Sequence, residues 1–322
     1  MSLLTLKPSS RRARSAAEFG KVAVLLGGDS TEREISLLSG NAVLAALIRR
    51  GVNAHAFDPQ DRQVQDLVNE GFDRVWIALH GPGGEDGTMQ GALEWLGVPY
   101  TGSGVLASAL TMDKLKTKRV VVGAGYAAPE YAVLSSPADL PRALKEIGLP
   151  MMVKPASQGS SVGITKVKAA AELAGAYAEA RAIDPIVFAE RFIAGDEYTV
   201  GVLHDRGLPS IRIQPATEFY DYQAKYFRND TQYHCPSGLA ADTEAELQAA
   251  AIAAFRVTDC AGWGRVDFMR DSKSGKFYFI EINTTPGMTD HSLVPMAARQ
   301  SGIDFEELVW RVLESSFLRE RK

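Results

Sequence analysis

The chain alternates between short apolar runs and longer segments whose apolar residues recur at helical spacing. From Lys21, KVAVLLGG predicts a buried strand, DSTEREISLLSGNAVLAALIRRG predicts a helix that ends near Gly51, and VNAHAFD predicts a second strand. The same order returns in FDRVWIALHG and GTMQGALEWLG. Strand–helix–strand repetition predicts a parallel sheet with helices on its faces, so we expect residues 21–112 to form an N-terminal α/β domain.

The pattern changes after residue 112. A Lys-rich helical segment, DKLKTKRVVVGAG, precedes the strand-like runs PMMVKPA, GITKV and IVFAERF, so we expect residues 113–197 to form a small α+β domain. Residues 198–322 are expected to form a third domain, which contains a predicted hairpin. Residues 1–20 are basic and lack the apolar stretch of a signal peptide, and we expect them to be a disordered extension.

The hairpin sequence GWGRVDFMRDSKSGKFYFIEIN places polar groups where further core residues would be expected. Side chains alternate faces along a strand, so Glu281 and Asn283 project to one side, and Arg265 and Asp267 share a side on the preceding strand. If the two strands pair, Asp267 lies opposite Phe279 or diagonal to Glu281. The hairpin therefore brings two carboxylates and an amide oxygen together.

These three oxygen donors suit magnesium, which prefers oxygen ligands and usually shares them with substrate phosphates. The alternative is a pair of acids in structural salt bridges at a sheet edge. Asp267, Asn283 and Arg265 on the same side as Glu281 favour a functional site over that alternative.

Composition narrows the class of protein. The chain has 322 residues with 46% hydrophobic content, enough for two or three globular domains. No apolar run approaches the roughly 20 residues that span a bilayer. The net charge of -4 gives no electrostatic footprint for nucleic acid. Cys235 and Cys260 have neither disulfide density nor metal-ligand spacing, which favours a reducing cytoplasm.

Short glycine patterns invite two other interpretations. Gly123, Gly125 and Ala128 have the spacing of a dinucleotide site, but a helical pattern precedes them and Pro129 follows, whereas that site needs a strand before and a helix after. The turn GGDSTERE, a candidate phosphate site at a helix N-terminus, lacks a third glycine and carries glutamates that repel anions.

The segment GSSVG, residues 159–163, matches the nucleophile elbow of hydrolases, and HGPGG resembles an oxyanion loop. Asp267, Asp290 and His291 follow in hydrolase order. An elbow lies between a strand and a helix, however, and here the loop connects two predicted strands. The pattern therefore weighs against a serine hydrolase, which would react with a fluorophosphonate at Ser161.

A phosphate-covering loop explains KPASQGSSVG better. Free backbone N–H groups of a Gly/Ser loop bind anions, Lys154 adds a positive charge before the loop, and Lys114 supplies a second. Further along, Glu190 and Phe192 share a strand face and Glu197 follows, a combination suited to a ribose and an adenine ring.

Several long motifs carry a more specific signal. LLGGDSTEREISLLSG, ALHGPGGEDGTMQGALEWLGVPYTGSG, MDKLKTK, VKPASQGSSVG, FYDYQAKY, GWGRVDFM and EINTTPGMTDHSLVPMAARQSG closely resemble segments of the bacterial D-alanine:D-alanine ligases of the ATP-grasp superfamily. The resemblance extends from Lys21 to about residue 313. It implies three domains, an ATP cleft between the central and C-terminal ones, a homodimer, and a cytoplasmic role in peptidoglycan synthesis.

The resemblance also implies a role for individual residues. Those implied to be catalytic are Glu32, Ser160, Tyr226, Arg265 and Gly287, and those near the two substrate carboxylates are His80, Ser292 and Leu293. Those implied to bind ATP are Lys114, Lys154, Glu190, Phe192, Ile193, Glu197, Lys225 and Met269, with Phe192 where relatives often have Trp. Asp267, Glu281 and Asn283 are implied to hold two Mg²⁺ or Mn²⁺ ions.

The implied reaction activates a poor electrophile. ATP phosphorylates the carboxylate of one D-alanine, and the amine of the second attacks the acyl phosphate. Tyr226 is expected to favour amide over ester formation, because relatives that use D-lactate tend to carry Phe there. A noncatalytic ATP-binding module is the main rival, since it would need the same lysines and metal ligands but neither Glu32 nor His80.

Overall fold

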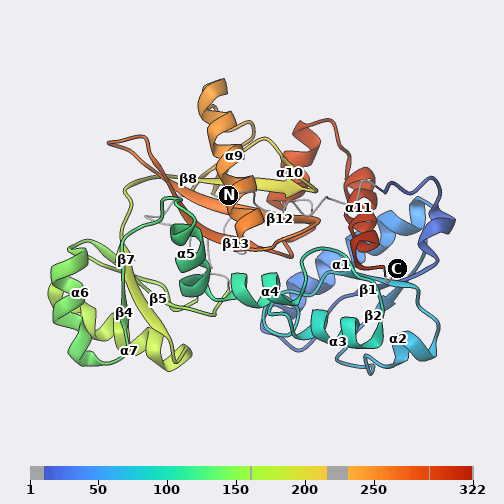
Figure 1. Ribbon diagram of the computed structural model, residues 1–322, viewed down its shortest axis with the longest axis horizontal. Helices are drawn as coiled ribbons and strands as arrows, with labels where there is room; N and C mark the ends of the chain where they lie inside the picture. Colours follow the sequence, from blue (N-terminus) through green and yellow to red (C-terminus); the bar gives the residue numbers. More distant parts are fainter. Residues whose placement is uncertain (1–10, 160–161, 216–230, 290, 321–322) are drawn as a thin grey trace.

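The computed structural model describes residues 11–159, 162–215, 231–289 and 291–320, and it places three sheets in three parts of the molecule (Figure 1). The N-terminal sheet has the strand order β2–β1–β3, and both of its strand pairs are parallel, as the sequence predicts. Its elements are β1 (Lys21–Leu25), α1 (Arg33–Arg49), β2 (Asn53–Phe57), α2 (Asp66–Asn69), β3 (Arg74–Ile77), α3 (Thr88–Leu96) and α4 (Val105–Met112).

The central sheet has the order β4–β7–β5–β6, with every neighbouring pair antiparallel. The loop that contains GSSVG therefore connects two antiparallel strands, as expected, and not a strand and a helix. Its strands are β4 (Tyr131–Leu134), β5 (Met151–Pro155), β6 (Thr165–Val167) and β7 (Val187–Arg191); the helices of this region are α5 (Lys114–Gly123), α6 (Leu140–Ile147) and α7 (Leu173–Ile183), with short 3₁₀ turns at η2 (Pro137–Asp139) and η3 (Ala170–Glu172).

The largest sheet has the order β11–β10–β8–β12–β13, and β9 pairs with β8. Its strands are β8 (Gly195–Leu203), β9 (Arg206–Gly207), β10 (Ile211–Gln214), β11 (Gln232–His234), β12 (Trp263–Asp271) and β13 (Phe277–Asn283). The accompanying helices are α9 (Ala241–Val257), α10 (Leu293–Gln300) and α11 (Phe305–Glu314), followed by the 3₁₀ helix η4 (Ser315–Arg319). Helix α5 lies between this sheet and the central one (Figure 1).

One hydrophobic core joins the N-terminal sheet to the C-terminal helices. Strand β1 is buried on both faces: Val22 and Val24 belong to this core, whereas Ala23 and Leu25 belong to a second core. The first core continues into α10 and α11. The N-terminal loops are therefore held in place relative to the end of β13 by shared apolar packing.

Residues 11–20, which we name the N-terminal clasp, differ from the expected disordered extension. A short 3₁₀ helix, η1 (Ala16–Phe19), precedes β1, and the Phe19 side chain is fully buried. Its ring stacks on Phe317 with centroids 5.4 Å apart and meets Trp310 edge-on at 4.8 Å. The prediction of disorder is wrong for these residues because the partners of Phe19 come from the other end of the chain.

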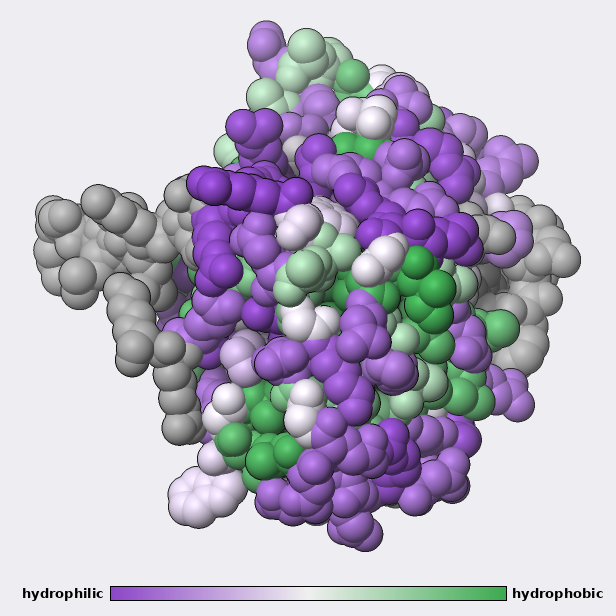
Figure 2. Space-filling view, turned by 90° about the vertical axis from the view of Figure 1, so that its right-hand side faces the viewer, coloured by the Kyte–Doolittle hydropathy of each residue, from purple (hydrophilic) through white to green (hydrophobic). Residues whose placement is uncertain are grey.

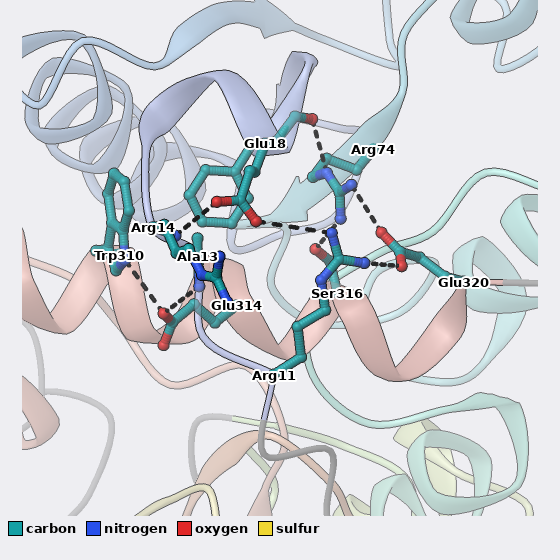
Figure 3. A network of polar contacts seen from close by, with 10 residues as sticks. Arg11, Ala13, Arg14, Glu18, Arg74, Trp310, Glu314, Ser316 and Glu320 are labelled. Atoms are coloured by element: carbon teal, nitrogen blue, oxygen red, sulfur yellow. Dashed lines mark hydrogen bonds and ion pairs between the residues drawn. The ribbon is translucent and has the colours of Figure 1, made fainter.

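Polar contacts surround this aromatic centre (Figure 3). The buried Glu314 carboxylate pairs with Arg12 at 2.6 Å and accepts the backbone N–H of Ala13 at 3.0 Å. Arg74 donates to the Phe19 carbonyl at 2.7 Å, and Arg11 pairs with Glu320. The N-terminal clasp thus ties η1 to β3, α11 and η4.

The face that carries the N-terminal sheet is largely hydrophilic, with smaller hydrophobic areas between the polar ones (Figure 2). Trp95 on α3 and Leu106 on α4 are among the exposed large apolar side chains, with 89% and 65% of their surface accessible. Within the described ranges, no helix combines the length and apolar character needed to cross a membrane.

Candidate functional site

The hairpin of β12 and β13 places Asp267 directly opposite Glu281. A β-bulge between Asp267 and Phe268 shifts the register, so that Phe268, not Asp267, lies opposite Phe279. The expected pairing of Asp267 with Phe279 or diagonally with Glu281 is therefore wrong, because an unbulged hairpin was assumed. Because of the bulge, the carboxylates of Asp267 and Glu281 lie directly opposite each other, and not diagonally as the sequence predicts.

Asp267 is saturated with hydrogen bonds. Arg265 donates to both of its oxygens, at 2.9 and 2.8 Å, and the Asn283 amide donates at 3.1 Å. The hydroxyl of Thr199, from the neighbouring strand β8, donates at 2.5 Å. Since Asp267 is only 2% exposed, these donors stabilise a buried charge. The predicted convergence of Arg265, Asp267 and Asn283 is confirmed.

Lys114 connects the hairpin to the loop that follows β5. Its ammonium lies 3.2 Å from the Glu281 carboxylate and donates to the carbonyl of Gln158 at 2.7 Å. Its backbone N–H donates to Ala156 at 2.8 Å. We name Lys114, Arg265, Asp267, Glu281 and Asn283 the hairpin site.

The donor set of the hairpin site fits a hard divalent cation. Two carboxylates and an amide lie on adjacent strands, and the positive charges of Arg265 and Lys114 now balance the carboxylates. Where the structure describes side chains, no three His, Cys, Asp or Glu residues gather in a metal-binding group. A metal here would thus rely on the Asn283 amide and on substrate oxygens in addition to the carboxylates.

A second charged group lies on the central sheet. Glu190 of β7 is 2% exposed, and its carboxylate contacts the ammonium of Lys154 at 2.5 Å and that of Lys118 at 2.7 Å. Burial raises the pKa of Glu190, but the two lysines outweigh it and hold the pKa at about 2. We name Lys118, Lys154 and Glu190 the buried triad.

Lys118 was not predicted from the sequence as a site residue. In a Lys-rich helix it resembles a solvated surface charge, yet it is 1% exposed. A signal was present, because Lys118 follows Lys114 by four residues and therefore lies on the same helix face.

The buried triad and the hairpin site are electrostatically linked. Burial lowers the pKa of Lys154, but the carboxylates of Glu190, Glu281 and Glu197 together raise it above its ordinary value. Glu197 also lies opposite Met269 in the pairing of β8 with β12. Residues from two sheets that are predicted to bind the nucleotide are therefore close enough for their charges to affect one another.

Phe192 and Ile193 lie just after β7. The Lys166 ammonium is 3.6 Å from the centre of the Phe192 ring, a cation–π contact, and Ile193 is buried. The Phe192 ring is thus held by a residue of β6 that the sequence pattern did not indicate as part of a site.

The predicted substrate residues lie between the N-terminal loops and the start of α10. His80 contacts the hydroxyl of Ser39 at 3.2 Å, and that hydroxyl accepts the backbone N–H of Met288 at 3.1 Å. Burial lowers the pKa of His80 to about 4, so its imidazole is neutral at pH 7.

Gly287 and Ser292 lie close to this group. A Cβ atom built on Gly287 would lie 2.9 Å from the Ser292 hydroxyl and 4.0 Å from that of Ser39. Leu293 follows as the first residue of α10 and is buried. The structure therefore brings His80, Gly287, Ser292 and Leu293 to one place.

Glu32 precedes α1 and faces the loop after β5. A Cβ atom on Gly159 would lie 2.6 Å from the Glu32 carboxylate, so a larger residue there would require the Glu32 side chain to shift. Burial and the nearby Glu32 raise the pKa of Glu85 to about 8, while Arg265 and Lys114 lower it. Glu85, whose carboxylate accepts the Gly81 N–H at 2.8 Å, is a second residue that was not predicted, although it lies in the HGPGGEDG motif.

Three predicted residues, Ser160, Lys225 and Tyr226, lie outside the described residues, as do Ser161 and Asp290. The hairpin site and the buried triad form one cluster, and His80, Gly287, Ser292 and Leu293 form a second. Glu85 lies close enough to Glu32, Arg265 and Lys114 for their charges to shift its pKa. Three cations, Lys114, Lys154 and Arg265, lie beside the buried carboxylates of Glu190 and Asp267 and the partly buried one of Glu281. Such an arrangement can bind phosphates and stabilise charge during phosphoryl transfer.

Comparison with known proteins identifies the family. The family model for the D-Ala-D-Ala ligase C-terminus matches residues 122–314, and that for the N-terminus matches residues 52–103. A D-alanine–D-alanine ligase of Laribacter hongkongensis is 56% identical over 300 residues, which cover 93% of this chain and 97% of that protein.

Solved structures agree with this result. The Bacillus anthracis D-alanine–D-alanine ligase matches with a TM-score of 0.83 and 34% identity, covering 93% of this chain and 98% of that one. Its complex with ATP matches with a TM-score of 0.81 and 32% identity over the same shares. The resemblance found in the sequence is confirmed: the chain belongs to the D-alanine–D-alanine ligase family and has the ATP-grasp fold.

Proposed function

We propose that this ATP-dependent ligase joins two molecules of D-alanine into D-alanyl-D-alanine, for peptidoglycan synthesis, through an acyl phosphate. One structural observation supports this reaction in addition to family membership. Lys114 connects the Glu281 carboxylate of the hairpin to the loop after β5, and Glu32 of the N-terminal region approaches the same loop at Gly159. A substrate bound at Glu32 would thus lie next to the loop and the lysine that are proposed to bind the ATP phosphates.

The cations would hold the phosphates. Lys114 and Lys154 are positioned to neutralise the ATP phosphates, and Arg265 would face the phosphoryl group as it is transferred. The ribose and adenine would be bound by Glu197, Met269, Phe192 and Ile193 near Glu190. Lys225 would add a further contact to ATP.

Two Mg²⁺ or Mn²⁺ ions would be held by Asp267, Glu281 and Asn283. Bound there, they would neutralise charge on the phosphates during transfer. In this structure Lys114 and Arg265 neutralise the carboxylates of Glu281 and Asp267, so these two side chains would have to move aside for a metal to bind.

The substrates would occupy the space between the N-terminal loops and α10. Glu32 would bind the ammonium of the first D-alanine, and the neutral His80 would lie near its carboxylate. The backbone N–H of Gly287 would stabilise the oxyanion, and Ser292 and Leu293 at the start of α10 would receive the second carboxylate. Ser160 and Tyr226 would complete the catalytic group.

The domain boundaries, the oligomeric state and the location in the cell are also part of this proposal. We propose domains at residues 21–112, 113–197 and 198–322, a homodimer, and a cytoplasmic location. The three separate sheets support three domains, but β8 (Gly195–Leu203) belongs to the largest sheet, which favours a second boundary before residue 195. The exposed Trp95 and Leu106 support an interface. Light scattering on the full chain and on Trp95→Ser tests the dimer, which should weaken in the variant if this surface is the interface.

A product assay tests the function. The full chain is incubated with ATP, Mg²⁺ and a panel of D-amino and D-hydroxy acids, and the products are identified by mass spectrometry. D-alanyl-D-alanine with D-alanine-dependent phosphate release supports the proposal. ATP binding without D-alanine-dependent phosphate release would instead indicate a noncatalytic ATP-binding module.

A further inference from the structure

Lys118 is the most deeply buried charged side chain near the proposed nucleotide site. It lies on α5, one helical turn after Lys114, and is 1% exposed, whereas the Lys114 side chain is 12% exposed. A lysine is rarely buried to this extent without a charged partner, because removing an ammonium from water is unfavourable. Its position in the interior therefore needs an explanation.

The partner of Lys118 is shared with a second lysine. Lys118 Nζ lies 2.7 Å from one oxygen of Glu190, and Lys154 Nζ lies 2.5 Å from the other. On adjacent strands β5 and β7, Lys154 is opposite Phe188 and Glu190 is opposite Met152, so the two charged residues are diagonal neighbours on one sheet face. Helix α5 covers that face through Leu115, which packs with Phe188 and Ala156.

The charges of the buried triad do not cancel. One carboxylate faces two ammonium groups, which leaves one net positive charge beside the residues proposed to hold phosphates. Burial lowers the pKa of Lys118, and the Glu190 carboxylate opposes that shift. If Lys118 were absent, Glu190 and Lys154 would form a neutral pair, and Lys154 would have no surplus charge to offer an anion.

We propose that Lys118 is a positioning residue of the nucleotide site: it fixes and neutralises the Glu190 carboxylate, so that the charge of Lys154 remains available to the phosphates. This inference rests on the proposed function, since it assumes that ATP binds beside Lys154. It assigns Lys118 no contact with substrate, and its effect passes through Glu190.

Nucleotide binding tests the inference. Dissociation constants for ATP and adenosine are measured by calorimetry and competition for the full chain and for Lys118→Met, and their ratio gives the contribution of the phosphates. This contribution should fall roughly tenfold in Lys118→Met, the effect of losing one charge-assisted interaction, while adenosine binding stays nearly unchanged. A merely structural residue would weaken both ligands together and lower the melting temperature.

A double variant isolates the path through Glu190. In Lys118→Met/Glu190→Gln no carboxylate neutralises Lys154, so most of the phosphate contribution lost in Lys118→Met should return. Lys118→Arg, which keeps the charge, should bind ATP within about threefold of the unsubstituted chain. Lys116→Met is the matched control on the same helix, because the Lys116 side chain is 61% exposed and pairs with Asp113 outside the triad.

The outcomes separate this inference from the proposed function. If Lys118→Met does not fold, Lys118→Gln removes the same charge but retains a donor to Glu190, and should also reduce the phosphate contribution. An unchanged contribution in a folded variant, equal losses for ATP and adenosine, or no recovery in the double variant would overturn the role of Lys118. A wild-type chain that binds no ATP would instead overturn the proposed function.

Discussion

Two groups of ion pairs join distant parts of this chain, and they are built in opposite ways. In the hairpin site the charges are at the centre. Asp267 is 2% exposed and accepts hydrogen bonds from side chains on β8, β12 and β13. In the N-terminal clasp the centre is aromatic, with Phe19 between Trp310 and Phe317. Arg74 and Glu314 are buried beside it, and Arg11 and Arg12 lie at a half-exposed rim.

The difference indicates which group serves chemistry and which serves stability. Buried ion pairs contribute little net stability because desolvation offsets their attraction, so a central cluster of charges is better explained by a ligand that uses it. Aromatic burial, by contrast, stabilises directly, and rim charges add little. Substitutions should therefore affect activity in the hairpin site and stability in the N-terminal clasp.

The largest expected effect is on activity. Glu281→Gln should lower kcat by roughly 10²–10³-fold while the protein stays folded, because the site loses an anionic ligand needed for charge neutralisation. D-alanine-dependent phosphate release and thermal melting are measured together. Glu246→Gln, at an exposed position of α9, is the control and should change neither. Near-normal turnover at saturating Mg²⁺ would remove the metal assignment.

The next effect is on stability. Phe19→Ala should lower the free energy of unfolding by roughly 3–5 kcal/mol, because it leaves a cavity between Trp310 and Phe317. Denaturant unfolding measures the change, and kcat of the folded fraction should stay within about twofold. A loss below 1 kcal/mol would mean that the N-terminal clasp does not form in solution.

His80 should make the substrate region sensitive to acid. The unfolded chain takes up a proton near the ordinary pKa of 6.5, but burial lowers the pKa in the folded chain to about 4. The free energy of unfolding should therefore fall as pH decreases from 6.5 to 4, by up to roughly 3 kcal/mol. His80→Gln should flatten the pH profile of stability over this range. Identical profiles for both proteins would contradict the buried neutral imidazole.

The smallest effect concerns the ion pair between the buried Glu314 and the half-exposed Arg12 of the N-terminal clasp. Glu314→Gln should cost about 1 kcal/mol of stability, because it removes the charge facing Arg12, whose side chain is 57% exposed. On the same helix, Glu306→Gln breaks the exposed pair with Arg49 and should cost less than about 0.5 kcal/mol. If Glu314→Gln impaired turnover without loss of stability, the contrast between the two regions would fail.

Local patterns were sufficient for much of the fold and for part of the site. Apolar runs predicted β1 and β5, and strand alternation predicted that Asp267 and Asn283 converge. These features depend on neighbouring residues, whose periodicity is visible in the sequence. The bulge after Asp267 was not predicted, because no glycine or proline marks it and it depends on pairing with β13.

Long-range contacts explain why the burial of Lys118 and the order of residues 11–20 were not predicted. Lys118 appeared to be a surface lysine because its partner, Glu190, is 72 positions further along the chain (190 − 118). The order of residues 11–20 depends on Trp310, Glu314 and Phe317, which no local pattern connects with them. Tertiary partners, and not local preference, determine such positions.

The ion pair between Arg11 and Glu320 brings the two described ends of the chain together. A pulling force applied between these ends would load the N-terminal clasp first, because η1 must separate from α11 and η4 before tension reaches β1. In a single-molecule stretching experiment, the first rupture should therefore be the release of this segment. Until then, tension would reach the N-terminal sheet through the contacts of Arg74 on β3 with Phe19 and Glu320.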